Sequence, residues 1–81
     1  MKLDVRGEVC PYPMMKALEA MRQLPEGELL EVLTDHPPSL ETIPPLANQL
    51  GFAWKIVERG GGQWAILIAR EAQVIEQALR A

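Results

Sequence analysis

The sequence predicts an α+β fold, a two-layer α/β sandwich in which two helices cover one face of a four-stranded mixed sheet. Three features predict it. Short segments that alternate between apolar and polar residues indicate strands. Two segments with apolar residues three or four positions apart indicate helices, and three consecutive glycines join the last two strands. The predicted order is β-α-β-α-β-β, and 81 residues are enough for one small domain.

The N-terminal part of the chain predicts a strand followed by a helix. Residues 2–6 alternate between polar and apolar side chains. A helix is expected over residues 11–23, because five apolar residues fall on one helical face. These are Met14, Ala17, Leu18, Met21 and Leu24. Pro11 suits the first helical position, which would make Cys10 the capping residue.

Three further strands are expected, over residues 29–34, 52–59 and 63–70. The first of them is the most apolar and is expected to be central, and a right-handed crossover would make it parallel to the N-terminal strand. Trp54 and Trp64 have the same phase on the last two strands, which predicts a cross-strand pair in the core. The glycines at 60–62 predict a hairpin turn with positive φ angles.

The second helix lies between these strands and ends at Gly51, which suits the left-handed conformation after a last turn. Ser39 or Thr42 is its expected cap. Pro44 and Pro45 are tolerated only in a first turn, and this favours Thr42.

The last residues of the chain form a weakly amphipathic segment. We therefore divide the chain into a domain over residues 1–70 and a C-terminal extension over 71–81 with helical periodicity.

Composition excludes several classes of function. The net charge is −3 and the basic residues are scattered, which argues against direct binding of nucleic acid. No apolar run reaches the length of a signal peptide or a membrane span, so no membrane association is expected. A single cysteine cannot form an internal disulfide and indicates a reducing, cytoplasmic location. Cys10 and His36 are the only soft ligands, so neither a metal ion nor a cofactor is expected.

Cys10 is the candidate catalytic residue because it stands at the start of a predicted helix. The helix dipole, together with the amides of Tyr12 and Met14 that we expect to be free, would stabilise a thiolate. Pro13 falls in the first turn, where a missing N–H breaks no helical bond. Arg6 or Lys16 would add positive charge if its side chain reached the site.

Several roles for this thiol remain open. A hydrolase would need a base, and His36 is the only histidine. A buried, structural cysteine would make the protein a non-catalytic binding or regulatory module. A dithiol oxidoreductase would need a second cysteine, which the chain lacks. A single activated thiol best suits a carrier that accepts a group from one protein and gives it to another.

Residues 3–13, which read Leu-Asp-Val-Arg-Gly-Glu-Val-Cys-Pro-Tyr-Pro, resemble the signature of the TusA/SirA family of small sulfur-carrier proteins. The similarity continues in the aliphatic strand before Asp35 and in the run Thr42-Ile43-Pro44, and it extends to Arg70. It implies a sandwich similar to the C-terminal domain of translation initiation factor 3. RNA binding by analogy with that factor would rest on the fold alone.

The resemblance implies a carrier protein of the sulfurtransferase type. Cys10 would accept a persulfide sulfur from a cysteine desulfurase or a rhodanese-like donor. It would pass this sulfur to an acceptor protein in tRNA thiolation, molybdenum-cofactor synthesis or sulfur metabolism. The resemblance assigns site-supporting roles to Asp4, Gly7, Pro11, Pro13 and Asp35. Arg6 and Met15 are candidate partner-docking residues, and exposed methionine suits adaptable interfaces.

The chain departs from the family pattern after the second strand. Many members have Asp-Asp-Pro or Asp-Asn-Pro there, whereas this chain has Asp35-His36-Pro37-Pro38. The difference bears on the identity of the partner more than on the chemistry of the thiol.

Overall fold

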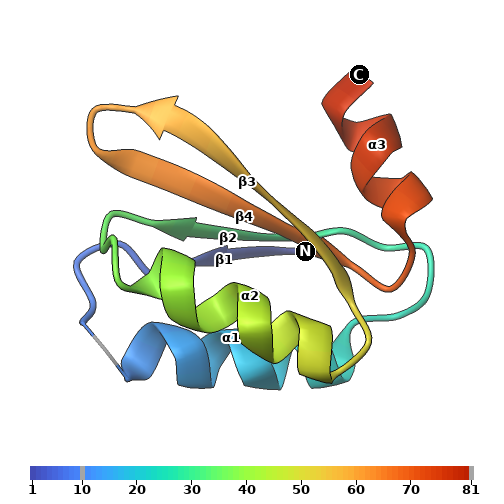
Figure 1. Ribbon diagram of the computed structural model, residues 1–81, viewed down its shortest axis with the longest axis horizontal. Helices are drawn as coiled ribbons and strands as arrows, with labels where there is room; N and C mark the ends of the chain where they lie inside the picture. Colours follow the sequence, from blue (N-terminus) through green and yellow to red (C-terminus); the bar gives the residue numbers. More distant parts are fainter. Residues whose placement is uncertain (10, 81) are drawn as a thin grey trace.

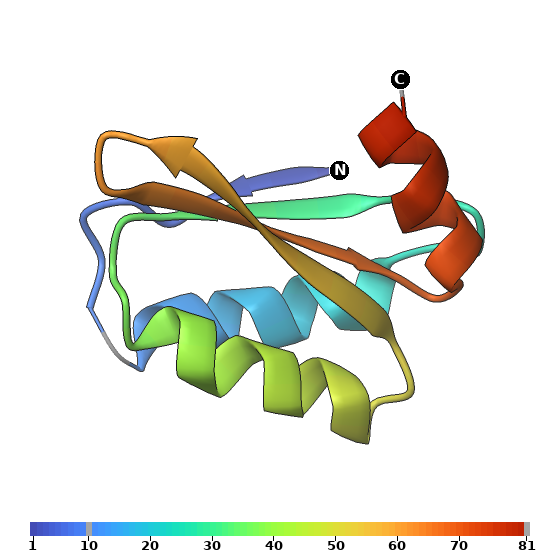
Figure 2. The same ribbon diagram turned by 45° about the horizontal axis from the view of Figure 1, so that its top comes forward.

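A computed structural model describes residues 1–9 and 11–80 of the chain. The elements follow the expected order, and the segment after Arg70 forms a third helix (Figure 1). Their bounds are β1 Lys2–Asp4, α1 Tyr12–Gln23, β2 Leu30–Thr34, α2 Ser39–Gln49, β3 Ala53–Gly60, β4 Gln63–Ala69 and α3 Ala72–Arg80. Helices α1 and α2 lie together on one face of the sheet, which confirms the predicted two-layer sandwich (Figure 2).

The four strands form one sheet in the order β1-β2-β4-β3. Strand β1 is parallel to β2, with Leu3 opposite Val32, and β4 is antiparallel to both of its neighbours. The predicted parallel pair and the central position of the second strand are therefore confirmed. Because β1 and β2 are parallel, the segments that follow them leave the same edge of the sheet (Figure 1).

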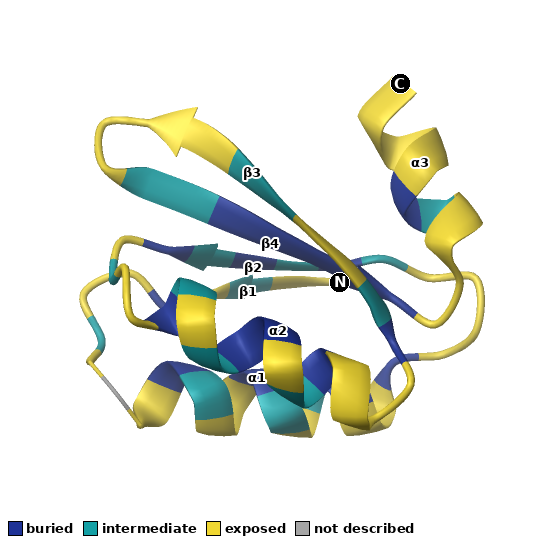
Figure 3. Ribbon diagram, viewed as in Figure 1, coloured by how far each residue is buried: buried dark blue, intermediate teal, exposed yellow. Residues whose placement is uncertain are grey.

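The main core lies between the two helices and the sheet (Figure 3). Fully buried apolar residues from both layers meet there, and they include Val5, Met21, Leu30, Ile43 and Ile66. A smaller cluster occupies the opposite face, where Ile75 of α3 packs with Leu67 and its neighbours. Strand β4 is consequently buried on both sides over residues 65–69, so it is the most enclosed strand of the sheet.

Helix α2 begins earlier than the sequence predicts. Pro38 flanks its start, Ser39 is already helical, and the prediction that favoured Thr42 as the cap is wrong. Pro44 and Pro45 therefore lie inside the helix, where their missing N–H groups leave carbonyls of the preceding turn without helical donors. Pro44 and its neighbours Ile43 and Ala47 are buried, so packing against the rest of the core compensates for the poor helix propensity of the two prolines.

The β3–β4 hairpin confirms one prediction and overturns another. All three glycines of its turn have positive φ angles, between 63° and 82°, as predicted. The expected pair of tryptophans is wrong, because Trp54 lies opposite Ile68 and Trp64 lies opposite Glu58. A turn centred on Gly61 sets this register, so the two tryptophans lie four residues apart along the ladder. Trp54 remains 38% exposed and donates a hydrogen bond of 3.0 Å to Asn48.

Candidate functional site

The loop between β1 and α1 contains Cys10, which itself lies outside the described residues, as does every role predicted for it. On the C-terminal side of Cys10, α1 begins at Tyr12, one residue later than predicted. Pro11 takes the flanking position with φ −97° and ψ 9°. The Tyr12 amide donates to the carbonyl of Val9 over 3.1 Å. The expectation that this amide is free is therefore wrong, because the chain turns tightly enough before the helix to use it.

The two prolines of the motif differ in their surroundings. Pro11 is exposed, whereas Pro13 is buried in the second position of α1. A proline at this position breaks no helical hydrogen bond, and its buried ring anchors the first turn against the rest of the fold. The sequence predicted both positions near the start of the helix, but only the structure distinguishes the buried ring from the exposed one.

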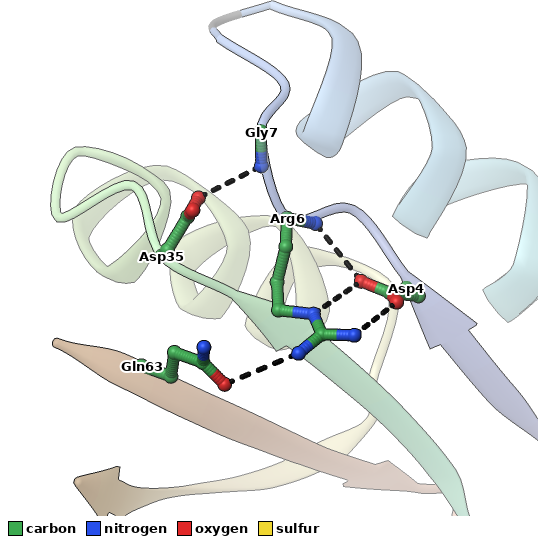
Figure 4. Close-up of polar contacts among 5 residues, drawn as sticks. All are labelled: Asp4, Arg6, Gly7, Asp35 and Gln63. Atoms are coloured by element: carbon green, nitrogen blue, oxygen red, sulfur yellow. Dashed lines mark hydrogen bonds and ion pairs between the residues drawn. The ribbon is translucent and has the colours of Figure 1, made fainter. Parts of the chain in front are cut away.

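Gly7 and Asp35 meet at the edge of the sheet that the two parallel strands share (Figure 4). The Gly7 amide donates a hydrogen bond of 2.9 Å to Oδ1 of Asp35. Gly7 has φ +81°, a conformation that favours glycine over residues with a Cβ atom. The buried Thr34, which the sequence did not single out, accepts a hydrogen bond of 3.1 Å from the His36 amide and shapes the turn after β2.

Asp4 and Arg6 form an ion pair beside this contact (Figure 4). Arg6 binds both carboxylate oxygens, through Nε at 3.0 Å and Nη2 at 2.8 Å, and its amide also donates to Oδ1 at 3.1 Å. These hydrogen bonds lower the pKa of Asp4 from 3.8 to about 2 and raise the pKa of Arg6. Nη1 of Arg6 also donates a hydrogen bond of 3.4 Å to Oε1 of Gln63 at the start of β4. No local sequence pattern indicates this partner.

The loop is also joined to α1 by an ion pair. Lys16 Nζ lies 2.7 Å from Oε2 of Glu8, and the Glu8 amide donates to the carbonyl of Val5 over 3.2 Å. Lys16 therefore contacts the loop two residues before Cys10. Sequence reasoning considered Lys16 as a source of positive charge but missed Glu8 as its partner, because residues eight positions apart share no helical or strand spacing.

Exposed apolar side chains precede, interrupt and follow the Cys-Pro-Tyr-Pro motif in the chain. Val9, Tyr12 and Met15 are 59%, 57% and 55% exposed, respectively. Met15 lies about one helical turn after Tyr12, on the exposed face of α1. His36 is half-buried in the turn after β2, and any contact between it and Cys10 lies outside the described residues.

Two further findings concern the whole described chain. Over residues 1–9 and 11–80, no three histidine, aspartate or glutamate side chains gather closely enough to hold a metal ion. Within the same residues, no helix combines the length and apolar character that crossing a bilayer requires.

Comparison with known proteins identifies the family. The family model described as "Sulfurtransferase TusA" matches residues 1–70. A Thermotoga maritima protein named "Putative sulfur carrier protein" is 45% identical over 67 residues, which cover 82% of this chain and 85% of that protein. The protein named "Putative sulfur carrier protein YedF" from Escherichia coli is 42% identical over 69 residues, which cover 85% of this chain and 90% of that protein.

The fold has a counterpart among solved structures. The crystal structure of a SirA-like protein from Desulfitobacterium hafniense superposes with a TM-score of 0.76 and 28% sequence identity, covering 83% of this chain and 92% of that one. Helix α3 lies beyond the residues that the family model matches. The match over residues 1–70, the relatives above 40% identity and the shared fold show that this chain belongs to the TusA family of sulfurtransferases.

Proposed function

We propose that this protein is a sulfur carrier that accepts a persulfide sulfur on Cys10 and relays it to an acceptor protein. The observation that carries the proposal is the anchored loop before α1. Its backbone is held at Gly7 by Asp35, and the helix begins two residues after the cysteine. Membership of the TusA family and the names of the relatives support the same role.

The proposed transfer consists of two exchange steps. The Cys10 thiolate attacks the terminal sulfur of a donor persulfide, a new S–S bond forms on Cys10, and the S–S bond of the donor breaks. The donor leaves as a thiolate. In the second step a thiolate of the acceptor attacks the outer sulfur on Cys10, and Cys10 leaves as a thiolate. Neither step has a net oxidation or reduction, and the proton released when the thiol ionises returns to solvent.

The donor is a cysteine desulfurase or a rhodanese-like protein, since both present a persulfide. The exposed side chains of Val9, Tyr12 and Met15 provide an apolar surface around the motif on which donor and acceptor dock in turn. Arg6, three residues before Val9, is a further docking candidate, and its guanidinium is already paired with Asp4. Acceptors in tRNA thiolation, molybdenum-cofactor synthesis and sulfur metabolism are the classes to test.

Intact-mass analysis after incubation with a cysteine desulfurase and cysteine tests the proposal, with Cys10→Ser as the control. We expect the wild-type protein to gain one sulfur atom, which a reductant removes, and the control to gain none. Separately, Met15→Glu should slow loading by weakening the encounter with the donor, while thermal unfolding stays unchanged. No gain with desulfurase and rhodanese donors, together with a Cys10 that resists alkylation until unfolding, would instead indicate a non-catalytic binding or regulatory module.

A further inference from the structure

The ion pair between Glu8 and Lys16 joins the loop that precedes Cys10 to helix α1. Glu8 belongs to the loop and Lys16 to α1, so the contact of 2.7 Å joins the chain on the two sides of Cys10. Glu8 is the less exposed partner, at 29% against 50% for Lys16. Together with the Gly7–Asp35 hydrogen bond, this pair restrains two consecutive loop residues, Gly7 and Glu8, which precede Cys10 by three and two positions.

The pair also determines the local balance of charge. The first turn of α1 contains no acidic residue, so the Glu8 carboxylate is the negative charge nearest to Cys10 along the chain. An unpaired carboxylate there would oppose ionisation of the thiol, because like charges disfavour each other. The ammonium of Lys16 compensates that charge directly.

Charged and titratable groups on the neighbouring elements offer less compensation. The guanidinium of Arg6 binds both oxygens of Asp4. Asp35 adds a second carboxylate, which the Gly7 amide partly satisfies. Lys2, Tyr12 and His36 are the remaining titratable groups on β1, at the start of α1 and in the turn after β2, and Lys2 is at the opposite end of β1 from the loop. The Tyr12 amide donates to Val9, so one of the two amides that the sequence predicts to be free is already used. Fewer backbone donors are therefore left for a thiolate than the sequence suggested.

From this geometry we infer that Lys16 and Glu8 are positioning residues for sulfur transfer: their ion pair holds the loop against α1 and compensates the Glu8 charge two residues before Cys10 in the chain. The inference rests on the proposed carrier function, because it gives the pair its purpose. The inference predicts the sign of each effect. Loss of Lys16 and loss of Glu8 must shift the pKa of the thiol in opposite directions.

The test is the pH dependence of iodoacetamide alkylation of Cys10 in the full-length protein. Lys16→Gln should raise the thiol pKa by about 0.3 to 0.5 unit and Glu8→Gln should lower it by a similar amount. Lys16→Arg should retain the wild-type profile, and the double variant Glu8→Gln/Lys16→Gln should lie close to it. Each pKa shift should be smaller in about 0.5 M salt, because dissolved ions screen the interaction between exposed charges.

A matched control is available on the sheet. Arg59 of β3 and Glu31 of β2 form an ion pair at 3.1 Å with similar exposure, 45% and 23%, and neither residue belongs to the loop before α1. Arg59→Gln and Glu31→Gln should leave the alkylation profile unchanged. Circular dichroism would verify that every variant is folded.

The inference would be overturned if Lys16→Gln and Glu8→Gln shifted the profile in the same direction or not at all, or if the control variants shifted it equally. Sulfur loading is scored separately by mass. Opposite shifts in a protein that never gains sulfur would reject the carrier function but retain the charge effect. Normal loading without the shifts would reject only the role of the pair.

Discussion

The amide of Gly7 donates its hydrogen bond to the carboxylate of Asp35 across the edge of the sheet where β1 and β2 both end (Figure 4). The two residues are 28 positions apart in the chain. Parallel pairing of the strands brings them together, so the loop before Cys10 is held by a side chain from the next strand. The geometry of the site therefore depends on correct pairing of β1 with β2.

Asp35→Ala should loosen the loop without unfolding the protein. It removes the acceptor of the Gly7 amide, a bond worth about 1 kcal/mol at an exposed site, which corresponds to roughly fivefold faster exchange of that amide. Hydrogen exchange followed by NMR measures the effect, and Asp35→Asn, which keeps an acceptor oxygen, should show a smaller one. Unchanged exchange at Gly7 in Asp35→Ala would contradict an anchoring role.

The ion pair between Asp4 and Arg6 should make stability depend on acidity. The pKa of Asp4 is about 2 in the folded protein, below its ordinary 3.8. Because the folded value is the lower one, the stabilisation is fully present above pH 3.8 and is lost as the pH falls through 2. Arg6→Gln should return the pKa of Asp4 toward 3.8, as observed by NMR titration of its carboxyl carbon. If the pKa stays near 2 in this variant, the pairing is not its cause.

Arg70 joins three parts of the fold at the end of β4. Its Nε donates to the carbonyl of Leu24 over 2.8 Å, and its guanidinium lies 5.0 Å from the centre of the Phe52 ring. Arg70→Ala should lower the free energy of unfolding by about 1 to 2 kcal/mol, since both contacts are lost. Urea unfolding followed by tryptophan fluorescence measures it. Arg70→Lys keeps the charge without the planar group, so its free energy of unfolding should lie between those of the wild type and Arg70→Ala. Equal stability of all three proteins would show that the Arg70 contacts do not stabilise the fold.

Pro45 is a site where substitution should stabilise the protein. It lies inside α2 and is exposed, so alanine would add an N–H for the carbonyl of Glu41 without removing core packing. We expect Pro45→Ala to raise the free energy of unfolding by roughly 2 kcal/mol, after allowing for greater freedom of the unfolded chain. Pro44→Ala provides the comparison, because loss of its buried ring should offset the gain. Destabilisation by Pro45→Ala in urea unfolding would show that the ring contributes to packing.

Local patterns predicted the elements well but not all of their boundaries. The periodicity of α1, the glycine turn and the alternating strands were all evident because each depends on residues close in sequence. The start of α2 was not evident from the sequence. Helix propensity places prolines in a first turn, whereas burial of Ile43 and Ala47 stabilises a helix that begins earlier. The predicted pairing of the two tryptophans was wrong for a related reason, because the position of the turn fixes which residues of β3 and β4 lie opposite each other.

The order of elements, the family and the cysteine motif at the start of α1 follow from the sequence alone, since these depend on local patterns and a contiguous signature. The contacts made by the residues before that motif follow only from the three-dimensional fold. Gly7 meets Asp35, Arg6 reaches Gln63, and Lys16 reaches Glu8. The first two contacts join residues far apart in the chain, and the third joins a loop to a helix. All three exist because burial of the apolar layer brings these segments together, and no pattern along the chain encodes such distances.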